Sequence, residues 1–236
     1  MMDRGAGPGD PDQRALVKIC GLRHRDDARR ADALGADYLG TVLSEGFRRS
    51  VTTDEARTVL EGTGATRVAV LVDESPERAA QLARSVHAGV IQLHGRESPE
   101  SVRTLRELGE WTVWKAVRAG SLRDLGDVVE RFGDIVDGFL VEGRLEGVVG
   151  GGGARLTLDP EAVRRTVPEG RTFILAGGIT PDTVQDAVAR FGPHVVDVSS
   201  GVEVTPGRKD PARLEAFILG ARTRGVAGSS DPRQDA

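Results

Sequence analysis

VKICG, the stretch at residues 17–21, sets the pattern that the rest of the chain repeats. Apolar residues alternate with Lys18 and Cys20, as in a β-strand that has one apolar and one polar face. A glycine follows at once, so the polar side chains stand at the carboxyl end of the strand. VDVSSGVE, at residues 196–203, has the same form near the other end of the chain. The two stretches predict strands that present their polar groups where they end.

Eight short apolar runs recur along the chain, with helical patterns between them. We predict strands at Leu16–Cys20, Tyr38–Leu43, Arg67–Val72, Gly89–Leu93, Thr112–Ala116, Ile135–Val141, Thr172–Ala176 and Val195–Ser199. The predicted helices include Asp26–Leu34, Pro76–Val86, Pro99–Leu108, Pro181–Arg190 and Pro211–Ala221. Proline recurs at an expected first helical turn, where its missing N–H costs nothing, at Pro76, Pro99, Pro160, Pro181 and Pro211.

This alternation predicts an α/β fold, a single (β/α)8 or TIM barrel over residues 15–224. Residues 1–14 and 225–236 are polar and lack apolar periodicity, so we predict two disordered tails. An open doubly wound sheet is the competing fold. It would ordinarily carry GxGxxG after its first strand, whereas this chain reads CGLR at residues 20–23.

Composition excludes several classes of protein. The 236 residues carry a formal net charge of −4 and are 39% hydrophobic and 29% charged, which argues against a nucleic-acid-binding surface. A single cysteine permits no internal disulfide and no thiol cluster for zinc. No run of residues has the length of a membrane span, and the amino-terminal stretch lacks the apolar core of a secretory signal. We therefore expect a cytoplasmic protein without a membrane or nucleic-acid partner.

Cys20 and Glu142 are the candidate catalytic residues. A thiol acts as a base or nucleophile in its thiolate form, and Lys18, on the same face of the strand, is expected to favour that form. The alternative for Cys20 is a buried structural cysteine. Glu142 ends an apolar strand, where burial is expected to raise its pKa and suit it to general acid catalysis. The alternative is a carboxylate at the rim that pairs with Arg144.

Two glycine- and serine-rich turns predict a phosphate site. Gly177 and Gly178 follow the seventh predicted strand, and Ser199, Ser200 and Gly201 follow the eighth. Glycine lets the backbone approach an anion, and the N–H groups of a short helix add a favourable dipole. In (β/α)8 barrels the loops after strands seven and eight often form such a site.

Other polar residues at strand ends have supporting roles. Gln92 and His94 close the fourth strand, where a hydrogen-bonding role is favoured over metal binding. Arg49 lies in the long loop after strand two and is suited to bidentate capture of a carboxylate. Asp197, below the serine turn, is expected to be a structural anchor. Residues 150–153, GGGG, are predicted to form a mobile loop that acts as a lid or hinge.

Taken together, these stretches resemble the phosphoribosylanthranilate isomerase family of tryptophan biosynthesis. The resemblance rests on VKICG (17–21), GADYLG (35–40), QLHG (92–95), WKAV (114–117), LAGGI (175–179), VDVSSGVE (196–203) and PGRKD (206–210). They occur in the family's order between about Leu16 and Arg222.

The resemblance implies an aldose–ketose isomerase, an intramolecular oxidoreductase that needs no cofactor and no metal. Its reaction is the Amadori rearrangement of N-(5-phosphoribosyl)anthranilate to 1-(2-carboxyphenylamino)-1-deoxyribulose 5-phosphate. By position, Cys20 is the general base and Arg49 the ligand of the anthranilate carboxylate. Glu142 stands where the family has the aspartate that acts as general acid. The expected partner is a phosphorylated small molecule, and the chain is expected to be a monomer or a homodimer.

Two other functions stay open at this point. One is a barrel isomerase for another aminoaldose or sugar phosphate, such as the doubly phosphorylated intermediate of histidine synthesis. That enzyme type normally has a phosphate loop in each half of the barrel, and the first half of this chain lacks one. The other is a non-catalytic barrel that binds a phosphorylated metabolite. A lysine beside the only thiol argues against it, because a sensor needs no activated thiol.

Overall fold

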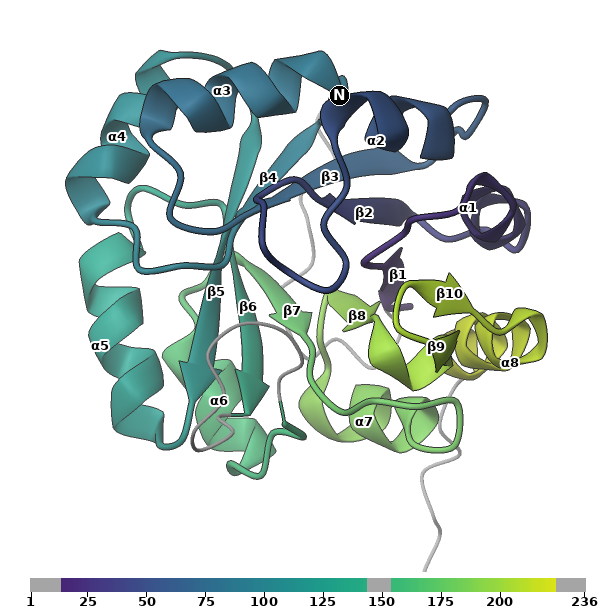
Figure 1. The fold of residues 1–236 in the computed structure, drawn as a ribbon. Helices are drawn as coiled ribbons and strands as arrows, with labels where there is room; N and C mark the ends of the chain where they lie inside the picture. Colours follow the sequence, from purple (N-terminus) through teal and green to yellow (C-terminus); the bar gives the residue numbers. More distant parts are fainter. Residues whose placement is uncertain (1–13, 144–153, 224–236) are drawn as a thin grey trace, which may run out of the picture.

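The parallel strands of this chain form a sheet that closes on itself as a barrel. The computed structural model describes residues 14–143 and 154–223. Eight parallel strands are hydrogen-bonded in the order β1-β2-β3-β4-β5-β6-β7-β8, and β8 returns to pair with β1. Helices surround this ring of strands (Figure 1). The predicted (β/α)8 barrel is confirmed.

The eight strands and the flanking elements match the predicted order closely. The strands are β1 (Leu16–Ile19), β2 (Tyr38–Val42), β3 (Thr66–Leu71), β4 (Val90–Leu93), β5 (Thr112–Ala119), β6 (Gly138–Gly143), β7 (Thr172–Leu175) and β8 (Val195–Val198). The helices are α1 (Arg25–Ala33), α2 (Thr53–Val59), α3 (Pro76–Ser85), α4 (Pro99–Glu107), α5 (Leu122–Phe132), α6 (Pro160–Thr166), α7 (Val184–Phe191) and α8 (Pro211–Arg222). A short 3₁₀ helix, η1 (Ser200–Val202), and a hairpin of β9 (Glu203–Thr205) and β10 (Arg208–Lys209) lie between β8 and α8 (Figure 1).

Two apolar layers stabilise the barrel. The larger layer packs strands against helices and contains Val17 and Ile19 of β1 and Phe139 and Val141 of β6. A smaller cluster fills the barrel interior and contains Cys20 and Leu140. The polar face of β1 therefore points toward the barrel axis, as the alternation predicted.

Helix starts follow the capping rules at most positions. Ser75, Ser98, Asp159 and Asp210 each accept a hydrogen bond from a backbone N–H in the first turn of the helix that follows, and proline occupies the first turn in each case. The prediction for Pro181 is wrong. Residues 181–183 form a turn in which the N–H groups of Thr183 and Val184 both donate to the Thr180 carbonyl, and the regular helix α7 begins at Val184.

Parts of the sequence-based prediction lie outside the described residues. These are the two predicted tails, apart from Arg14, and the glycine loop at residues 150–153. Within the described ranges, no helix has the length and apolar character required to cross a membrane.

Candidate active site

The register between β1 and β8 creates a buried ion pair at the mouth of the barrel. Lys18 and Asp197 are direct neighbours in the parallel ladder. The Lys18 Nζ lies 2.9 Å from the Asp197 Oδ1, and both residues are buried. Burial lowers the pKa of Lys18, but the Asp197 carboxylate and the Cys20 thiol more than offset this and the pKa is raised. The predicted anchoring role of Asp197 fits this geometry.

Cys20 lies directly beyond the end of β1 and is 8% exposed. Burial raises the pKa of the thiol, and the Asp197 charge acts in the same direction. Lys18 and Lys209 act in the opposite direction without reversing the net shift. The expectation that Lys18 makes Cys20 a ready thiolate is therefore wrong for the protein by itself: desolvation outweighs the neighbouring ammonium groups.

Glu142 ends a polar chain that runs across β4, β5 and β6. The Gln92 Nε2 lies 3.0 Å from the His94 Nδ1, and the His94 Nε2 lies 3.2 Å from the Glu142 Oε1. The Arg118 Nε donates to the same carboxylate oxygen at 3.1 Å. Glu142 is 5% exposed. His94 thus has the hydrogen-bonding environment that was predicted for it at the rim.

The expected rise in the Glu142 pKa is wrong. Burial alone raises it, but the hydrogen bonds and charges of His94 and Arg118 outweigh burial and lower the pKa below its ordinary value. Glu142 is therefore a carboxylate at neutral pH in this arrangement. Arg144, the partner weighed for Glu142 in the sequence, lies outside the described residues.

Arg118 is the residue beside Glu142 that the sequence did not predict. The fifth strand was predicted to stop at Ala116, whereas β5 continues to Ala119. Arg118 is thereby placed opposite Glu142 in the parallel ladder. The alternation of side chains along a strand could have indicated Arg118. Trp114 and Ala116 point into the barrel, and Arg118 is the next position on the same face of β5.

The predicted phosphate loops lie against each other. Gly177, Gly178, Ser199, Ser200 and Gly201 line one cavity of about 50 Å³ at the carboxyl ends of β7 and β8. A Cβ atom on Gly201 would lie 2.0 Å from the Ile179 carbonyl oxygen, so only glycine permits this contact between the loops. The structure thus brings together the five residues that the sequence assigned to one phosphate site.

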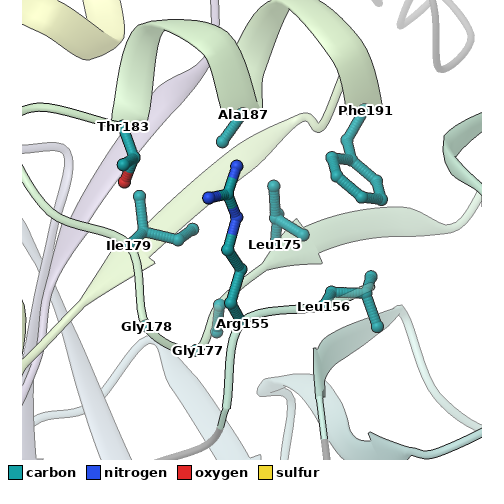
Figure 2. A pocket seen from close by; sticks show the side chains of 10 residues that line it. Arg155, Leu156, Leu175, Gly177, Gly178, Ile179, Thr183, Ala187 and Phe191 are labelled. Atoms are coloured by element: carbon teal, nitrogen blue, oxygen red, sulfur yellow. The ribbon is translucent and has the colours of Figure 1, made fainter. Parts of the chain in front are cut away.

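The segment that begins at Ala154 packs against the β7–α7 loop. Ala154 and Gly143 exchange two backbone hydrogen bonds, of 2.9 and 3.0 Å, beside the end of β6. Figure 2 shows Arg155 extending from this segment past Gly177 and Gly178 toward α7. The Arg155 Nη2 lies 3.5 Å from the Asp186 Oδ2.

Arg49 reaches the mouth of the barrel, but a carboxylate of the protein already pairs with it. Its Nε and Nη2 contact the two oxygens of Glu203 at 2.9 and 2.6 Å. Lys209, in β10, lies 2.9 Å from the same Glu203 and is buried. These cations lower the pKa of Glu203 to about 2, against the opposing effect of burial. The sequence did not predict this role for Glu203 or Lys209. Both lie in stretches that were singled out, residues 196–203 and 206–210, but no pattern in the sequence indicates that they form an ion pair.

The arrangement supplies a thiol, a carboxylate with a histidine beside it, and a cavity lined by glycine and serine residues at one end of the barrel. In the described part of the chain, no group of three or more His, Cys, Asp or Glu residues could hold a metal ion. Such a fold and site define the class of (β/α)8-barrel enzymes that work at the carboxyl ends of their strands.

Comparison with known sequences identifies the family. The family model described as N-(5'-phosphoribosyl)anthranilate (PRA) isomerase matches residues 17–219. A protein of that name from Chromohalobacter salexigens is 40% identical over 213 residues, which cover 88% of this chain and 94% of the relative. The homologue from Trichlorobacter lovleyi is 36% identical and covers 87% and 97% of the two chains. The chain belongs to the phosphoribosylanthranilate isomerase family.

Solved structures agree with this assignment. The phosphoribosylanthranilate isomerase of Thermotoga maritima superposes with a TM-score of 0.77 at 32% identity, over 88% of this chain and 98% of that one. A further structure of a phosphoribosylanthranilate isomerase holds reduced 1-(o-carboxyphenylamino)-1-deoxyribulose 5-phosphate. It superposes with a TM-score of 0.75 at 31% identity and the same coverage.

Proposed function

We propose that this protein isomerises N-(5-phosphoribosyl)anthranilate to 1-(2-carboxyphenylamino)-1-deoxyribulose 5-phosphate in tryptophan biosynthesis, without a cofactor. The observation that supports the proposal is the cavity lined by the β7 and β8 loops, at the same end of the barrel as the Cys20 thiol, in a chain that matches the family over residues 17–219. Family membership makes the chain an aldose–ketose isomerase. The substrate and the residue roles are the proposal.

In the proposed first step, protonated Glu142 donates its proton to the furanose ring oxygen. The bond from that oxygen to C1 breaks, and the nitrogen lone pair forms a Schiff base with C1. Because His94 and Arg118 hold the pKa of Glu142 down, the acid works only after this pKa rises. We propose that substrate entry causes the rise, by excluding water and drawing Arg118 away from the carboxylate.

In the proposed second step, the Cys20 thiolate removes the proton on C2. The electrons of that C–H bond form an enolamine, and the Schiff base accepts the displaced pair at nitrogen. The enolamine then tautomerises to the product ketone. Lys18 and Lys209 are the cations that oppose the effect of burial on the thiol pKa. Since the net shift of the thiol pKa is upward, the thiolate is the minority form of Cys20, and these two cations increase its share.

The remaining predicted residues position the substrate in this proposal. Gly177, Gly178, Ser199, Ser200 and Gly201 bind the phosphate through backbone N–H groups and hydroxyls. Arg49 binds the anthranilate carboxylate. Since Glu203 occupies the Nε and Nη2 of Arg49, the carboxylate is received by the other side of the guanidinium.

Complementation tests the proposal. A tryptophan auxotroph that lacks this isomerase should grow without tryptophan when it expresses the chain, and should not grow when it expresses Cys20→Ala. A histidine auxotroph that lacks the corresponding aminoaldose isomerase serves as the second arm. Rescue of the histidine strain alone, or of neither strain by folded protein, would contradict the proposed substrate.

A further inference from the structure

Lys209 is fully buried below the mouth of the barrel, although it belongs to the two-residue strand β10. Its Nζ donates to the Cys20 carbonyl at 2.6 Å, to the Ser199 carbonyl at 3.1 Å and to the Glu203 Oε1 at 2.9 Å. A lysine ammonium has three N–H donors, and these three acceptors use them all. Lys209 therefore has no donor left for a substrate, and its contacts are internal.

The three acceptors of Lys209 belong to three different parts of the candidate site. Cys20 carries the thiol, Ser199 is part of the loop that lines the anion cavity, and Glu203 pairs with Arg49. Arg49 in turn packs on Gly21: a Cβ there would lie 2.4 Å from the Arg49 Cδ.

The burial of the Lys209 ammonium below the mouth of the barrel needs a physical explanation. Desolvation of the charge is expensive, and an apolar side chain of similar volume would often stabilise the fold as well or better. Burial lowers the pKa of Lys209 and prevails over Glu203, which acts in the opposite direction and compensates the charge. What an apolar side chain could not do is bind two carbonyls and a carboxylate in one fixed arrangement.

We propose that Lys209 is a positioning residue that fixes the thiol-bearing turn, the phosphate loop and the substrate-binding arginine relative to one another. This inference rests on the proposed function. It assigns Lys209 two effects: preorganisation of the phosphate loop, and a positive charge close to the Cys20 thiol. Neither effect requires contact with the substrate.

Several charged groups act on Cys20, so the second effect has to be separated from the others. Lys18 lies on the same strand, Asp197 on β8, Lys209 on β10 and Arg49 in the loop after β2. Asp197 raises the thiol pKa, while Lys18 and Lys209 lower it. Removal of Lys209 alone should therefore raise the pKa of Cys20, with Lys18 and Asp197 still paired.

The test uses the full chain and its Lys209→Met variant, which keeps the length of the side chain but not its charge or donors. Arg49 continues to compensate Glu203 in this variant, so no carboxylate is left alone. We expect the dissociation constant for inorganic phosphate, measured by calorimetry, to rise about tenfold, as for the loss of charge-assisted hydrogen bonds. Because Cys20 is the only cysteine, titration of thiolate ultraviolet absorbance reports its pKa directly, and this should shift upward.

Lys115→Met is the matched control. Lys115 is also a buried lysine, with its Nζ 2.9 Å from the Glu97 Oε2, but its acceptors lie at the end of β4 and in the loop after it. We expect both variants to melt at lower temperature than the parent protein. Only Lys209→Met should alter phosphate affinity and the thiol pKa, because a general loss of stability affects neither.

Unchanged phosphate affinity together with an unchanged thiol pKa in folded Lys209→Met would overturn the proposal. The same holds if Lys115→Met changes both quantities equally. If Lys209→Met does not fold, Lys209→Gln, which is one atom shorter and retains a neutral donor, is measured in its place with the same criteria. Failure of the parent protein to turn over phosphoribosylanthranilate would refute the proposed function instead, and the thiol titration would still decide whether Lys209 acts on Cys20.

Discussion

The two sides of the barrel mouth are built differently. On the β1–β8 side, Lys18 and Lys209 are fully buried and their ion pairs are closed to solvent. On the β4–β6 side, the Glu142 carboxylate is buried, but its partners are more open: the side chain of Arg118 is 32% exposed and that of His94 is 16% exposed. One side thus has fixed charges, and the other has charges at the edge of solvent.

This difference bears on what each side can do. Buried ion pairs hold a constant electrostatic environment, because their rearrangement would expose unpaired charge in a medium of low polarity. An arginine with about a third of its side chain exposed, such as Arg118, can leave a carboxylate and be solvated at small cost. In the proposed reaction, the base needs a stable environment, whereas the acid has to change its pKa when the substrate arrives. The structure of the mouth fits that division of tasks.

The largest effect should come from the fixed side. Cys20→Ala removes the proposed base and should lower kcat by about a thousandfold, the contribution typical of a positioned base. Inorganic phosphate should still bind, because the loops after β7 and β8 do not depend on the thiol. Steady-state kinetics measures the loss of kcat, and calorimetry on the same preparation measures the binding of inorganic phosphate. A Cys20→Ala enzyme with undiminished kcat would show that the thiol is not the base.

Substitution of Glu142 should give the second-largest effect. Glu142→Ala should lower kcat by about a hundredfold through loss of the proposed acid. Glu142→Asp, which restores the family's residue at this position, should keep the activity or raise it. The comparison is made by initial rates at saturating substrate. Full activity in Glu142→Ala would show that another residue is the general acid, whatever the activity of Glu142→Asp.

Arg118 tests whether the acid side is adjustable. Arg118→Met removes a cation that lowers the pKa of Glu142, so this pKa should rise. A general acid is active while protonated, and the alkaline limb of kcat/KM against pH should therefore move to higher pH, with a rate change of only severalfold. Arg106→Met, which breaks a similar ion pair with Asp137 elsewhere, is the control and should leave the profile in place. A limb that moves to lower pH in Arg118→Met contradicts the proposed electrostatics.

Glu203 should give the smallest effect, seen in stability. Its pKa falls from 4.5 in the unfolded chain to about 2 in the folded protein. The stabilising contribution of its charge is therefore complete above pH 4.5 and is lost as the pH falls toward 2. Glu203→Gln lacks this contribution and should melt about 2–4 °C lower near neutral pH. Thermal melts across pH should show the two proteins converging in acid, and a constant difference would mean that another group carries the effect.

Much of the fold was predictable because each strand–helix unit has sequence signals within a few residues of its ends. Period-two alternation in β1 and proline after a capping serine or aspartate at α3, α4, α6 and α8 are short-range signals. The start of α7 was predicted at Pro181, three residues early, because proline marks the turn that follows Thr180, whereas the regular helix starts after that turn, at Val184. The strand β5 was predicted to end at Ala116, three residues early. No residue near Arg118 marks the end of a strand, and the pairing of β5 with β6 decides how far the strand extends.

The candidate site divides in the same way. Spacing along single strands predicted which face carries Lys18 and Cys20, and small residues at strand ends predicted the phosphate loops. The partners of Glu142 and Arg49 come from strands and loops far away in sequence, so no local pattern could name Arg118 or Glu203 for them. The errors in the pKa directions have the same origin, because each shift is a balance of burial against charges on other strands.

The sequence by itself determined the eight units, the inward face of β1 and the chemical groups available at the strand ends, since these depend on side-chain alternation and backbone preference within a few residues. The tertiary structure alone decided which charges meet: Lys18 with Asp197, Arg118 with Glu142, and Lys209 with three separate turns. The physical reason is the closure of the barrel. It sets the register between neighbouring strands and the depth of each group below the solvent, and on these two quantities the protonation of Cys20 and Glu142 depends.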